Sequence, residues 1–338
     1  MRKYLPYITL LIAVLMIFPA KGQDPYFSQF YNAPLTLNPA LTGITYGKIR
    51  VGANYRNHLS SFDPFETYAF SIDMSTFQSQ LNHDFAGVGM TVVNDVSGYG
   101  LKNLKAMFSM AYHKSLNARG TQFISIASQA GIDQTNLNYG NLSTQSQWVA
   151  DQGVDQSLGN GEQITGDNSV LFDLQAGILY YAFLGKDHVL FLWSAVYHIM
   201  EPEKSLLDGN SKLNRRYVAH AGGRIAMGRK TTLIPNFVYM EQNKSQVINS
   251  GLMLEYQLSN KKDNQVISAG AWLRNTDAII INTGLEFKNM QVGVSYDLLI
   301  SDITTVTQKG GFEISLLYHF KKSVQPVTKL KQNPNPRF

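Results

Sequence analysis

The chain has 338 residues, no cysteine and a formal charge of +5 at neutral pH. The lack of cysteine excludes disulfides, thiolate metal sites and a cysteine nucleophile. Charged residues make up only 16% of the sequence, against ~25% in typical soluble domains, so much of the surface need not face water.

The N-terminus has the three parts of a secretory signal peptide. Arg2 and Lys3 give a positive start, residues 5–18 form an apolar core, and Ala20-Lys21-Gly22 fits the small-x-small cleavage rule. We therefore expect residues 1–22 to be removed, leaving Gln23 first. A membrane anchor is the alternative, but the apolar core would span only ~21 Å of a ~30 Å hydrocarbon layer. No later stretch is apolar enough for a transmembrane helix.

Cleavage changes the charge balance. The mature chain has a net charge of +2, because three bases are lost with the signal peptide. Residues 321–338 hold five Lys and Arg without an acid, so the body from 23 to 320 has a net charge of −3. A nucleic-acid-binding protein needs a strongly basic face, so the sequence predicts no nucleic-acid partner.

Residues 23–47 contain three prolines and several aromatic residues but little periodicity. Two interpretations stay open: a periplasmic strap that its prolines keep out of a sheet, or a plug or docking peptide whose aromatic residues pack into a lumen or onto a partner. The candidate residues for a plug or partner segment are Gln23, Asp24, Pro25, Phe27, Ser28, Gln29, Phe30, Tyr31, Asn32, Pro34, Asn38, Pro39, Ala40 and Gly43.

From residue 48 apolar and polar side chains alternate, which predicts strands with one apolar and one polar face. Most segments have 9 to 12 residues, close to the ~9–11 of a tilted transmembrane strand, and their number is even, as in bacterial outer-membrane barrels. The predicted fold is an all-β, antiparallel outer-membrane β-barrel over residues 48–320. Its 14 strands are expected at 48–57, 66–74, 84–94, 102–113, 121–132, 169–183, 188–199, 214–227, 231–241, 246–257, 264–274, 277–287, 290–299 and 311–320.

The connections between these strands differ in length by position. Those after odd-numbered strands are mostly long: 58–65, 95–101, 133–168, 200–213 and 300–310. Those after even-numbered strands are mostly short. Two connections are exceptions: 75–83, after an even-numbered strand, is long, and 242–245, after an odd-numbered strand, is short. Outer-membrane barrels have long extracellular loops and short periplasmic turns, whereas a secreted β-sandwich has no reason to sort its loops. We therefore expect both termini in the periplasm, with 321–338 as a basic periplasmic tail.

Several side chains suggest how the barrel meets its surroundings. Tyr55, Tyr197, Trp272 and Tyr296 lie near strand ends and are expected in the interfacial belts, with scattered core aromatics as the alternative. The polar strand faces and residues 23–47 are expected to fill the lumen, with long side chains such as Arg50, Arg56 and His319 contributing.

The sequence argues against an enzyme and against a bound cofactor or metal. It contains no Gly-x-Ser-x-Gly, His-Glu-x-x-His or phosphate-binding loop. Ser194 and His198 are expected on one strand face about two pleats apart, too far for a catalytic hydrogen bond. The acids of the 133–168 loop do not follow the register of a calcium loop, so a solvated loop is preferred.

The run Gln23-Asp24-Pro25-Tyr26-Phe27-Ser28-Gln29-Phe30-Tyr31-Asn32-Ala33-Pro34-Leu35-Thr36-Leu37-Asn38-Pro39-Ala40-Leu41-Thr42-Gly43 resembles the opening of the PorP/SprF family, outer-membrane barrels of the type IX secretion system of Bacteroidetes. The resemblance implies a non-enzymatic accessory role in the secretion or surface display of large adhesin or gliding-motility proteins. It implies outer-membrane lipid, other secretion components and such a cargo protein as partners. The alternative is a passive transport barrel for small solutes; a barrel hydrolase is a third, weaker interpretation.

Overall fold

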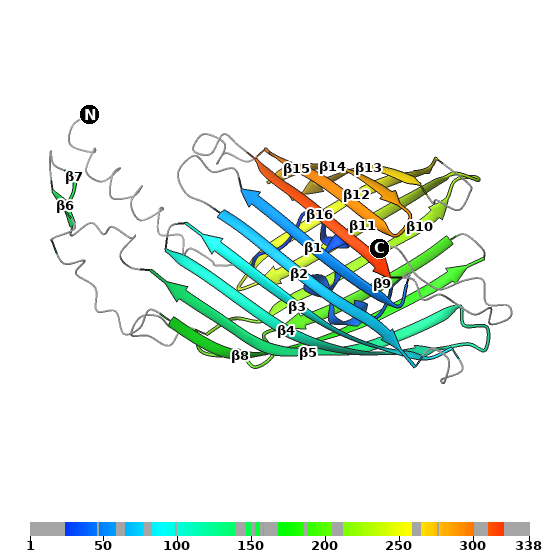
Figure 1. Cartoon of the computed structure of the whole chain (residues 1–338), viewed down its shortest axis with the longest axis horizontal. Coiled ribbons are helices and arrows are strands. Elements are labelled where there is room, and N and C mark those ends of the chain that lie inside the picture. The colour runs from blue at the N-terminus through cyan, green and yellow to red at the C-terminus, as the bar shows by residue number, and fades with distance from the viewer. Residues whose placement is uncertain are drawn as a thin grey trace, which may run out of the picture.

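The computed structural model describes residues 24–45, 47–58, 65–77, 83–98, 100–138, 147–149, 153–155, 158, 168–185, 188–204, 212–258, 265–275, 277–300 and 310–320. Over these residues the chain forms a closed antiparallel barrel of 14 strands with a helical N-terminal segment inside it (Figure 1). None of the described helices is long and apolar enough to cross a membrane. The predicted signal peptide, Gln23, the tail 321–338 and most of the 133–168 loop lie outside the described residues.

The predicted barrel and its number of strands are confirmed. The strands are β1 Ile49–His58, β2 Phe65–Thr76, β3 Phe85–Ser97, β4 Leu101–Ser115, β5 Gln122–Leu137, β8 Asn168–Leu184, β9 His188–Tyr197, β10 Arg216–Ala226, β11 Thr231–Gln242, β12 Ser245–Gln257, β13 Val266–Arg274, β14 Ala278–Phe287, β15 Met290–Leu299 and β16 Gly311–Phe320. A separate two-stranded sheet, β6 Trp148–Val149 and β7 Gly153–Val154, lies in the connection between β5 and β8.

The largest differences from the predicted boundaries occur at the C-terminal ends of β5 and β3. The strand β5 continues to Leu137 instead of ending at 132, and β3 continues to Ser97 instead of ending at 94. Asp133, which we expected in a solvated loop, therefore lies inside β5 with a fully buried side chain. Long polar strands at a barrel mouth are difficult to separate from loops by sequence, because no apolar face marks their extent.

Closure follows from the backbone. In lipid, each backbone N–H and C=O must find a partner within the protein, so an open sheet edge is not tolerated. The first and last strands pair along their full length, from Ile49 opposite Phe320 to His58 opposite Gly311. The barrel thus has no free edge.

The two faces of the wall differ as the alternation predicted. In β2, Tyr68, Phe70 and Ile72 point outward and are 39–50% exposed, whereas Ser71 and Asp73 point inward and are at most 6% exposed. The same pattern continues around the barrel, so the apolar outer surface suits hydrocarbon.

The inner surface has two parts, one of which the sequence did not predict. Polar and charged side chains line most of the inside of β1–β5, β8, β15 and β16, although Phe85, Phe123, Leu179 and Tyr181 are buried there near the short-turn end. Buried apolar side chains line much of the inside of β9–β14. These are Phe191, Trp193, Val218, Ile234, Val238, Met240, Val247, Met253, Trp272 and Ile280. Tyr197 and Trp272 belong to the interior, each 2% exposed, so their assignment to interfacial belts was wrong. Tyr296 faces outward and is 38% exposed.

The two ends of the barrel are distinct. At one end, here named the long-loop end, lie the three longest connections, 138–167, 198–215 and 300–310. At the other, the short-turn end, the connections are 77–84, 116–121, 185–187, 227–230, 258–265 and 288–289. The connections 59–64, 98–100, 243–244 and 275–277 also lie at the long-loop end, so the difference in length is carried by three loops.

An arginine placed on the outer wall tests the assignment of that face to lipid. Ile281 lies midway along β14 and is 51% exposed. Ile281→Arg should destabilise the barrel in lipid vesicles, reducing its free energy of unfolding by about 2–4 kcal/mol, which is the cost of a base at the membrane midplane. Denaturant titration would measure it, with Ile281→Val as the control. Equal stability of the two variants would contradict the lipid-facing assignment.

Candidate functional site: the lumenal segment

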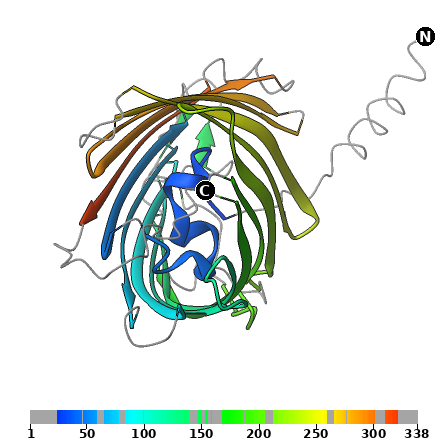
Figure 2. The ribbon, with the colours of Figure 1, turned by 90° about the vertical axis from the view of Figure 1, so that its right-hand side faces the viewer.

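Residues 24–45, here named the lumenal segment, run through the interior of the barrel (Figure 2). The segment contains three short helical elements: η1 Phe30–Asn32, α2 Pro34–Leu37 and η2 Pro39–Leu41. It contacts opposite sides of the wall, because η1 packs against β16 while η2 packs against β4, β5 and β8. The segment therefore occupies the lumen and does not lie against a single strand.

The prolines and Asn38 explain the local shape. Pro34 and Pro39 occupy the first position of their helical elements, where a fixed φ is favourable and no N–H is needed. Asn38 caps η2 by accepting a hydrogen bond from the Ala40 N–H at 2.8 Å. Its amide also donates to the backbone oxygens of Ile178 and Ser194 in the wall, at 3.3 and 3.2 Å. The Asn38 side chain thus caps the start of η2 and also binds this helical turn to the barrel wall.

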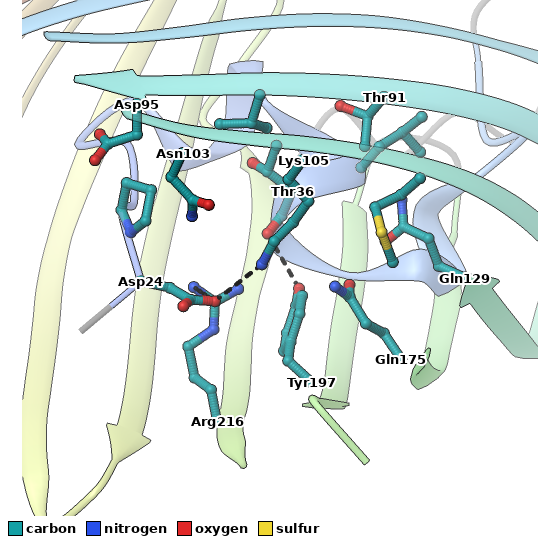
Figure 3. Close-up of a pocket in the computed structure, with 14 residues that line it drawn as sticks. Asp24, Thr36, Thr91, Asp95, Asn103, Lys105, Gln129, Gln175, Tyr197 and Arg216 are labelled. Carbon is teal, nitrogen blue, oxygen red and sulfur yellow. Dashed lines mark hydrogen bonds and ion pairs between the residues drawn. The ribbon is translucent and has the colours of Figure 1, made fainter. Parts of the chain in front are cut away.

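A charged cluster holds the first described residue at the long-loop end. The Asp24 carboxylate lies 2.7 Å from Nε2 of His198. It also lies 3.4 Å from Nζ of Lys105 and 3.6 Å from Arg216 (Figure 3). Nδ1 of His198 lies 2.9 Å from Asp173 on the far side of the ring. The imidazole therefore bridges a carboxylate of the lumenal segment and a carboxylate of the wall.

The electrostatics of this cluster favour charged partners. Burial alone would raise the pKa of Asp24, but the surrounding cations hold that pKa well below its usual value. Burial alone would lower the pKa of His198, yet Asp24 and Asp173 raise it above its usual value. The pair is thus stabilised in its ionised form, which attaches the segment to the mouth of the barrel.

A second buried cluster binds the backbone around Ser28. Glu313 accepts hydrogen bonds from the N–H groups of Ser28 and Gln29, at 2.5 and 2.8 Å. Asp297 accepts from the Ser28 hydroxyl at 2.7 Å. Arg56 joins both acids, at 3.1 Å from Asp297 and 3.0 Å from Glu313, with all three side chains 2% exposed. Buried charges are costly unless paired and hydrogen-bonded, and here the lumenal segment provides several of the required donors.

Aromatic side chains of the segment pack against the apolar half of the lumen. Tyr31 stacks on Trp272 with ring centroids 5.8 Å apart. Phe30 makes edge contacts with Trp272 and His220, at 6.4 and 5.5 Å. Phe27 packs separately against Ala69 and Val93. The apolar inner wall that the sequence did not predict is therefore the surface against which Phe30 and Tyr31 pack.

Near the short-turn end the segment is held by Asp73 and His113. Asp73 forms a two-bond ion pair with Arg50 and accepts from the Gly43 N–H at 2.8 Å. His113 lies with Nε2 2.8 Å from the Thr42 carbonyl oxygen. The segment is thus attached along its whole length, from the long-loop mouth to the start of β1.

Three wall glycines let the segment approach the backbone. A Cβ at position 177 would lie 1.9 Å from Oδ1 of Asn38, and one at position 87 would lie 2.1 Å from the Thr42 oxygen. A Cβ at position 293 would lie 2.3 Å from Oε1 of Gln29. Side chains at these positions would require the segment to move, so the wall and the segment fit each other closely.

A small cavity remains between the segment and the wall. It has about 40 Å³ of space for water, and its lining includes Thr91, Asn103, Gln129 and Gln175 together with apolar side chains such as Leu35 and Met107 (Figure 3). Among the described residues, the Gln129 amide nitrogen is buried without a hydrogen-bond partner. The cavity therefore has room for a few water molecules.

The candidate residues from the sequence are brought together here. All of them except Gln23, which is outside the described residues, lie in the lumen. Those that are buried are Phe27, Ser28, Gln29, Phe30, Asn32, Pro34, Asn38, Pro39, Ala40 and Gly43, while Asp24, Pro25 and Tyr31 are partly buried. Arg50, Arg56 and His319 also face inward, and His319 contacts Thr45.

The sequence analysis missed the partners of the segment. Asp73, Asp297 and Glu313 were placed on the polar strand faces by alternation, but nothing in the pattern paired them with residues 24–43. Lys105 and Asp173 were not singled out at all. A signal was present, because charges at alternate positions of strands with an apolar outer face must be paired in the interior.

One geometric expectation was wrong. Ser194 faces outward, while His198 follows β9 with a positive φ of 54° and points into the lumen, so the two do not share a strand face. The first described residue, Asp24, lies beside the two ends of the 198–215 connection, and the last, Phe320, lies at the short-turn end. The termini themselves, which we expected in the periplasm, lie outside the described residues. Within the described residues no group of three His, Asp or Glu side chains could hold a metal ion.

A larger side chain at position 177, in the space that Asn38 occupies, should displace the lumenal segment. Gly177→Val places atoms where Asn38 Oδ1 lies, whereas Ile178→Val on the outer face changes only the lipid surface. We expect a cysteine introduced as Ala40→Cys to become reactive to a water-soluble maleimide in the Gly177→Val protein only. Ala40 is 0% exposed in the native packing. Protection in both backgrounds would show that the fit at Gly177 is not needed.

Attachment at Asp24 should depend on pH. His198 has a raised pKa, so its contribution is complete below its unfolded value and is lost as the pH rises through its folded value. Asp24 has a lowered pKa, so its contribution is lost only at strongly acidic pH. A spin label at Pro25→Cys should gain mobility, measured by electron paramagnetic resonance, as the pH rises through the His198 transition. His198→Gln should remove that step, and a step that persists would assign it to another group.

Comparison with known proteins agrees with the fold. The Pseudomonas putida toluene transporter TodX has a TM-score of 0.52 at 11% identity, with 87% of this chain and 93% of that chain covered. The Ralstonia pickettii toluene transporter TbuX has a TM-score of 0.49 at 11% identity, with 86% and 94% covered. At such identities the likeness shows the fold alone. No curated protein matches the sequence.

A family profile gives a more specific result. The profile described as type IX secretion system membrane protein PorP/SprF matches residues 20–318, which include the whole barrel except its last two residues and all of the lumenal segment. The match confirms the resemblance carried by residues 23–43. The chain therefore belongs to the PorP/SprF family of type IX secretion system membrane proteins.

Proposed function

We propose that this protein is a non-enzymatic accessory barrel of the outer membrane that assists the secretion or surface display of a large adhesin or gliding-type cargo protein. The long-loop end and Asp24 face the cell exterior, and the short-turn end and Phe320 face the periplasm. Membership of a type IX secretion family supports the pathway. The observation that carries the role is the lumenal segment, which occupies the interior where a transport pore would need free space.

The number of strands determines whether the lumen of a barrel can be open. Barrels of about 8 strands are filled by their own side chains, whereas porins of about 16–18 strands hold water channels. A 14-stranded barrel lies between them, so its lumen is open or closed according to what else lies inside. Here the segment is held by ion pairs at Asp24, by hydrogen bonds from Ser28 to a buried carboxylate, by aromatic packing at Phe30 and by Asp73 near the other end. It therefore occupies the lumen as an attached part of the structure.

A passive transport barrel is the second candidate. The structures similar in fold include a toluene transporter, which favours a channel for small apolar molecules. The size of the internal cavity argues against that substrate class, because its space of about 40 Å³ is well below the ~150 Å³ of a cavity that admits benzene. A path for hydrocarbons needs an apolar lining, and the apolar half of this lumen is already packed.

The barrel contains no recognisable source of energy in its sequence, so work in secretion must come from its partners. We propose outer-membrane lipid around the wall, other secretion components at the short-turn end, and the cargo as partners. In this scheme the barrel provides a fixed platform at the membrane, and the lumenal segment keeps the permeability barrier intact.

Cysteine labelling tests the orientation directly, because the chain has no native cysteine. Trp148→Cys lies between β5 and β8 at the long-loop end, and Arg229→Cys lies in the turn between β10 and β11. On intact cells a membrane-impermeant maleimide should label the first and not the second. Permeabilised cells provide the control, in which both should react. Labelling of Arg229→Cys on intact cells would reverse the proposed orientation.

A deletion strain tests the function. Loss of the protein should remove a particular large protein from the surface proteome without slowing the uptake of small solutes. Replacing Phe27, Phe30 and Tyr31 by Ser should weaken the seating of the lumenal segment, since removing a buried Phe side chain costs about 3–5 kcal/mol. That triple variant should assemble but display less cargo. The outward-facing Phe108→Leu serves as its control. An unchanged surface proteome with slowed uptake would favour the transporter.

A further inference from the structure

The outer wall carries an apolar groove across β16, β1, β2 and β3, which lie side by side (Figure 1). At its centre Ala53 of β1 lies opposite Phe70 of β2 and Leu316 of β16. Because a methyl group is flanked by larger side chains, a hollow of about 400 Å³ remains between them. Tyr55 and Tyr68 line the groove on the side of the long-loop end. The groove therefore faces the hydrocarbon of the membrane and ends near the headgroups at the long-loop end.

An acidic side chain lies between the groove and the long-loop end. Glu66 is the second residue of β2 and shares the outward face of this strand with Tyr68. Its carboxylate accepts hydrogen bonds from the Tyr68 hydroxyl at 2.8 Å, the Tyr55 hydroxyl at 3.0 Å and the Asn57 amide at 2.9 Å. These donors are neutral, so they orient the carboxylate and leave its negative charge in place. Over the described part of the chain, no base forms an ion pair with Glu66.

A basic side chain lies at the same level two strands further along the wall. Glu66 pairs with Val96 of β3, and Val96 pairs with Lys102 of β4, so all three lie on one outward row. Neighbouring strands are ~4.8 Å apart, which places the Glu66 and Lys102 backbones ~10 Å from each other. Lys102 is exposed, and among the described residues it has no acidic partner. The groove thus ends beneath an acid and a base whose charges no described residue neutralises.

We propose that the groove binds a phospholipid whose headgroup carries both a phosphate and a primary amine, as in phosphatidylethanolamine. One acyl chain lies against Ala53, the ammonium donates hydrogen bonds to Glu66, and the phosphate is bound by Lys102. A headgroup with both charges matches the acid and the base of one outward row, and charge-assisted hydrogen bonds are about twice as strong as neutral ones. The proposal goes beyond the role in secretion and holds for either orientation of the barrel, because it concerns the leaflet at the long-loop end.

The headgroup, and not the acyl chain, gives the site its selectivity. Every chain in the bilayer is already in an apolar environment, so moving one into the groove gains no hydrophobic free energy. A purely anionic headgroup would leave the Glu66 carboxylate without a cation. A choline headgroup has no N–H group, so it cannot donate a hydrogen bond to Glu66. A headgroup with a primary amine is therefore expected to bind most tightly.

Native mass spectrometry of the purified full-length protein tests the proposal. The protein is held in detergent micelles with equal amounts of phosphatidylethanolamine, phosphatidylcholine and phosphatidylglycerol that share the same acyl chains, and the retained lipids are counted. The charge variant is E66Q/K102Q. Its matched control is E241Q/K244Q, which removes an outward acid at the long-loop end of β11 and a base in the following turn, outside the groove lining.

A second pair of variants tests the groove itself. Ala53→Leu fills the hollow, whereas Ala271→Leu adds the same atoms to the outer face of β13. We expect the native protein to retain about fivefold more phosphatidylethanolamine than either other lipid. This preference should fall below about twofold in E66Q/K102Q and in Ala53→Leu, and it should be unchanged in both controls.

Three results for lipid retention would overturn the proposal. They are equal retention of the three lipids by the native protein, a preference for phosphatidylglycerol, and a preference for phosphatidylethanolamine that survives either E66Q/K102Q or Ala53→Leu. A dimer that retains no lipid and that Ala53→Leu dissociates would assign the groove to a second copy of the chain, and it would overturn the proposal as well.

Discussion

The interior of a barrel of this width cannot be filled by the wall alone, and the rest of the structure depends on how that space is occupied. Eight strands leave room only for their own side chains, whereas fourteen leave a lumen that holds either water or chain. This protein fills it with residues 24–45. The interior charges, the apolar inner wall of β9–β14 and the wall glycines are each explained by this segment. Arg56, Asp297 and Glu313 would be costly as an isolated buried group, but Ser28 and Gln29 complete their hydrogen bonds.

The same arrangement sets the order of assembly. The segment precedes β1 in sequence and is enclosed once β1 pairs with β16 over ten residue pairs. A segment attached by ion pairs of Asp24 at one mouth and by hydrogen bonds to Arg50 and Asp73 near the other cannot easily enter a closed barrel. We infer that it is in place before the first and last strands meet. Its binding then contributes to closure, because Ser28 and Gln29 donate hydrogen bonds to Glu313 on β16. From the neighbouring strand β1, Arg50 and Arg56 donate to the backbone of the segment.

The wall was predictable because its physics is local and periodic. Alternation in segments such as β2 and β16 reports directly on a lipid-facing and an inward face, and the number of strands follows from counting such segments. The ends of β3 and β5 were predicted less accurately, since polar strand ends at the mouth carry no apolar signal. The segment was recognised as important from Pro34, Asn38 and its aromatic residues, but its path was not. Contacts such as Asp24 with His198 join residues 174 positions apart, and no periodicity encodes such a pairing. The apolar inner wall was not predicted for the same reason. Trp272, near a strand end, has the sequence position of an interfacial belt residue, and only its contact with Tyr31 in the folded chain shows that it faces the lumen.

The proposed function follows from the occupied lumen of a barrel that belongs to a secretion family. The occupied lumen distinguishes this protein from a solute channel of similar fold. Conductance of the purified protein in planar lipid bilayers tests that central claim most directly. The account predicts no stable ohmic conductance for the native protein at neutral pH, because residues 24–45 remain seated. A steady, porin-sized conductance through the native protein would contradict it and would make passage of small solutes the better explanation of the fold.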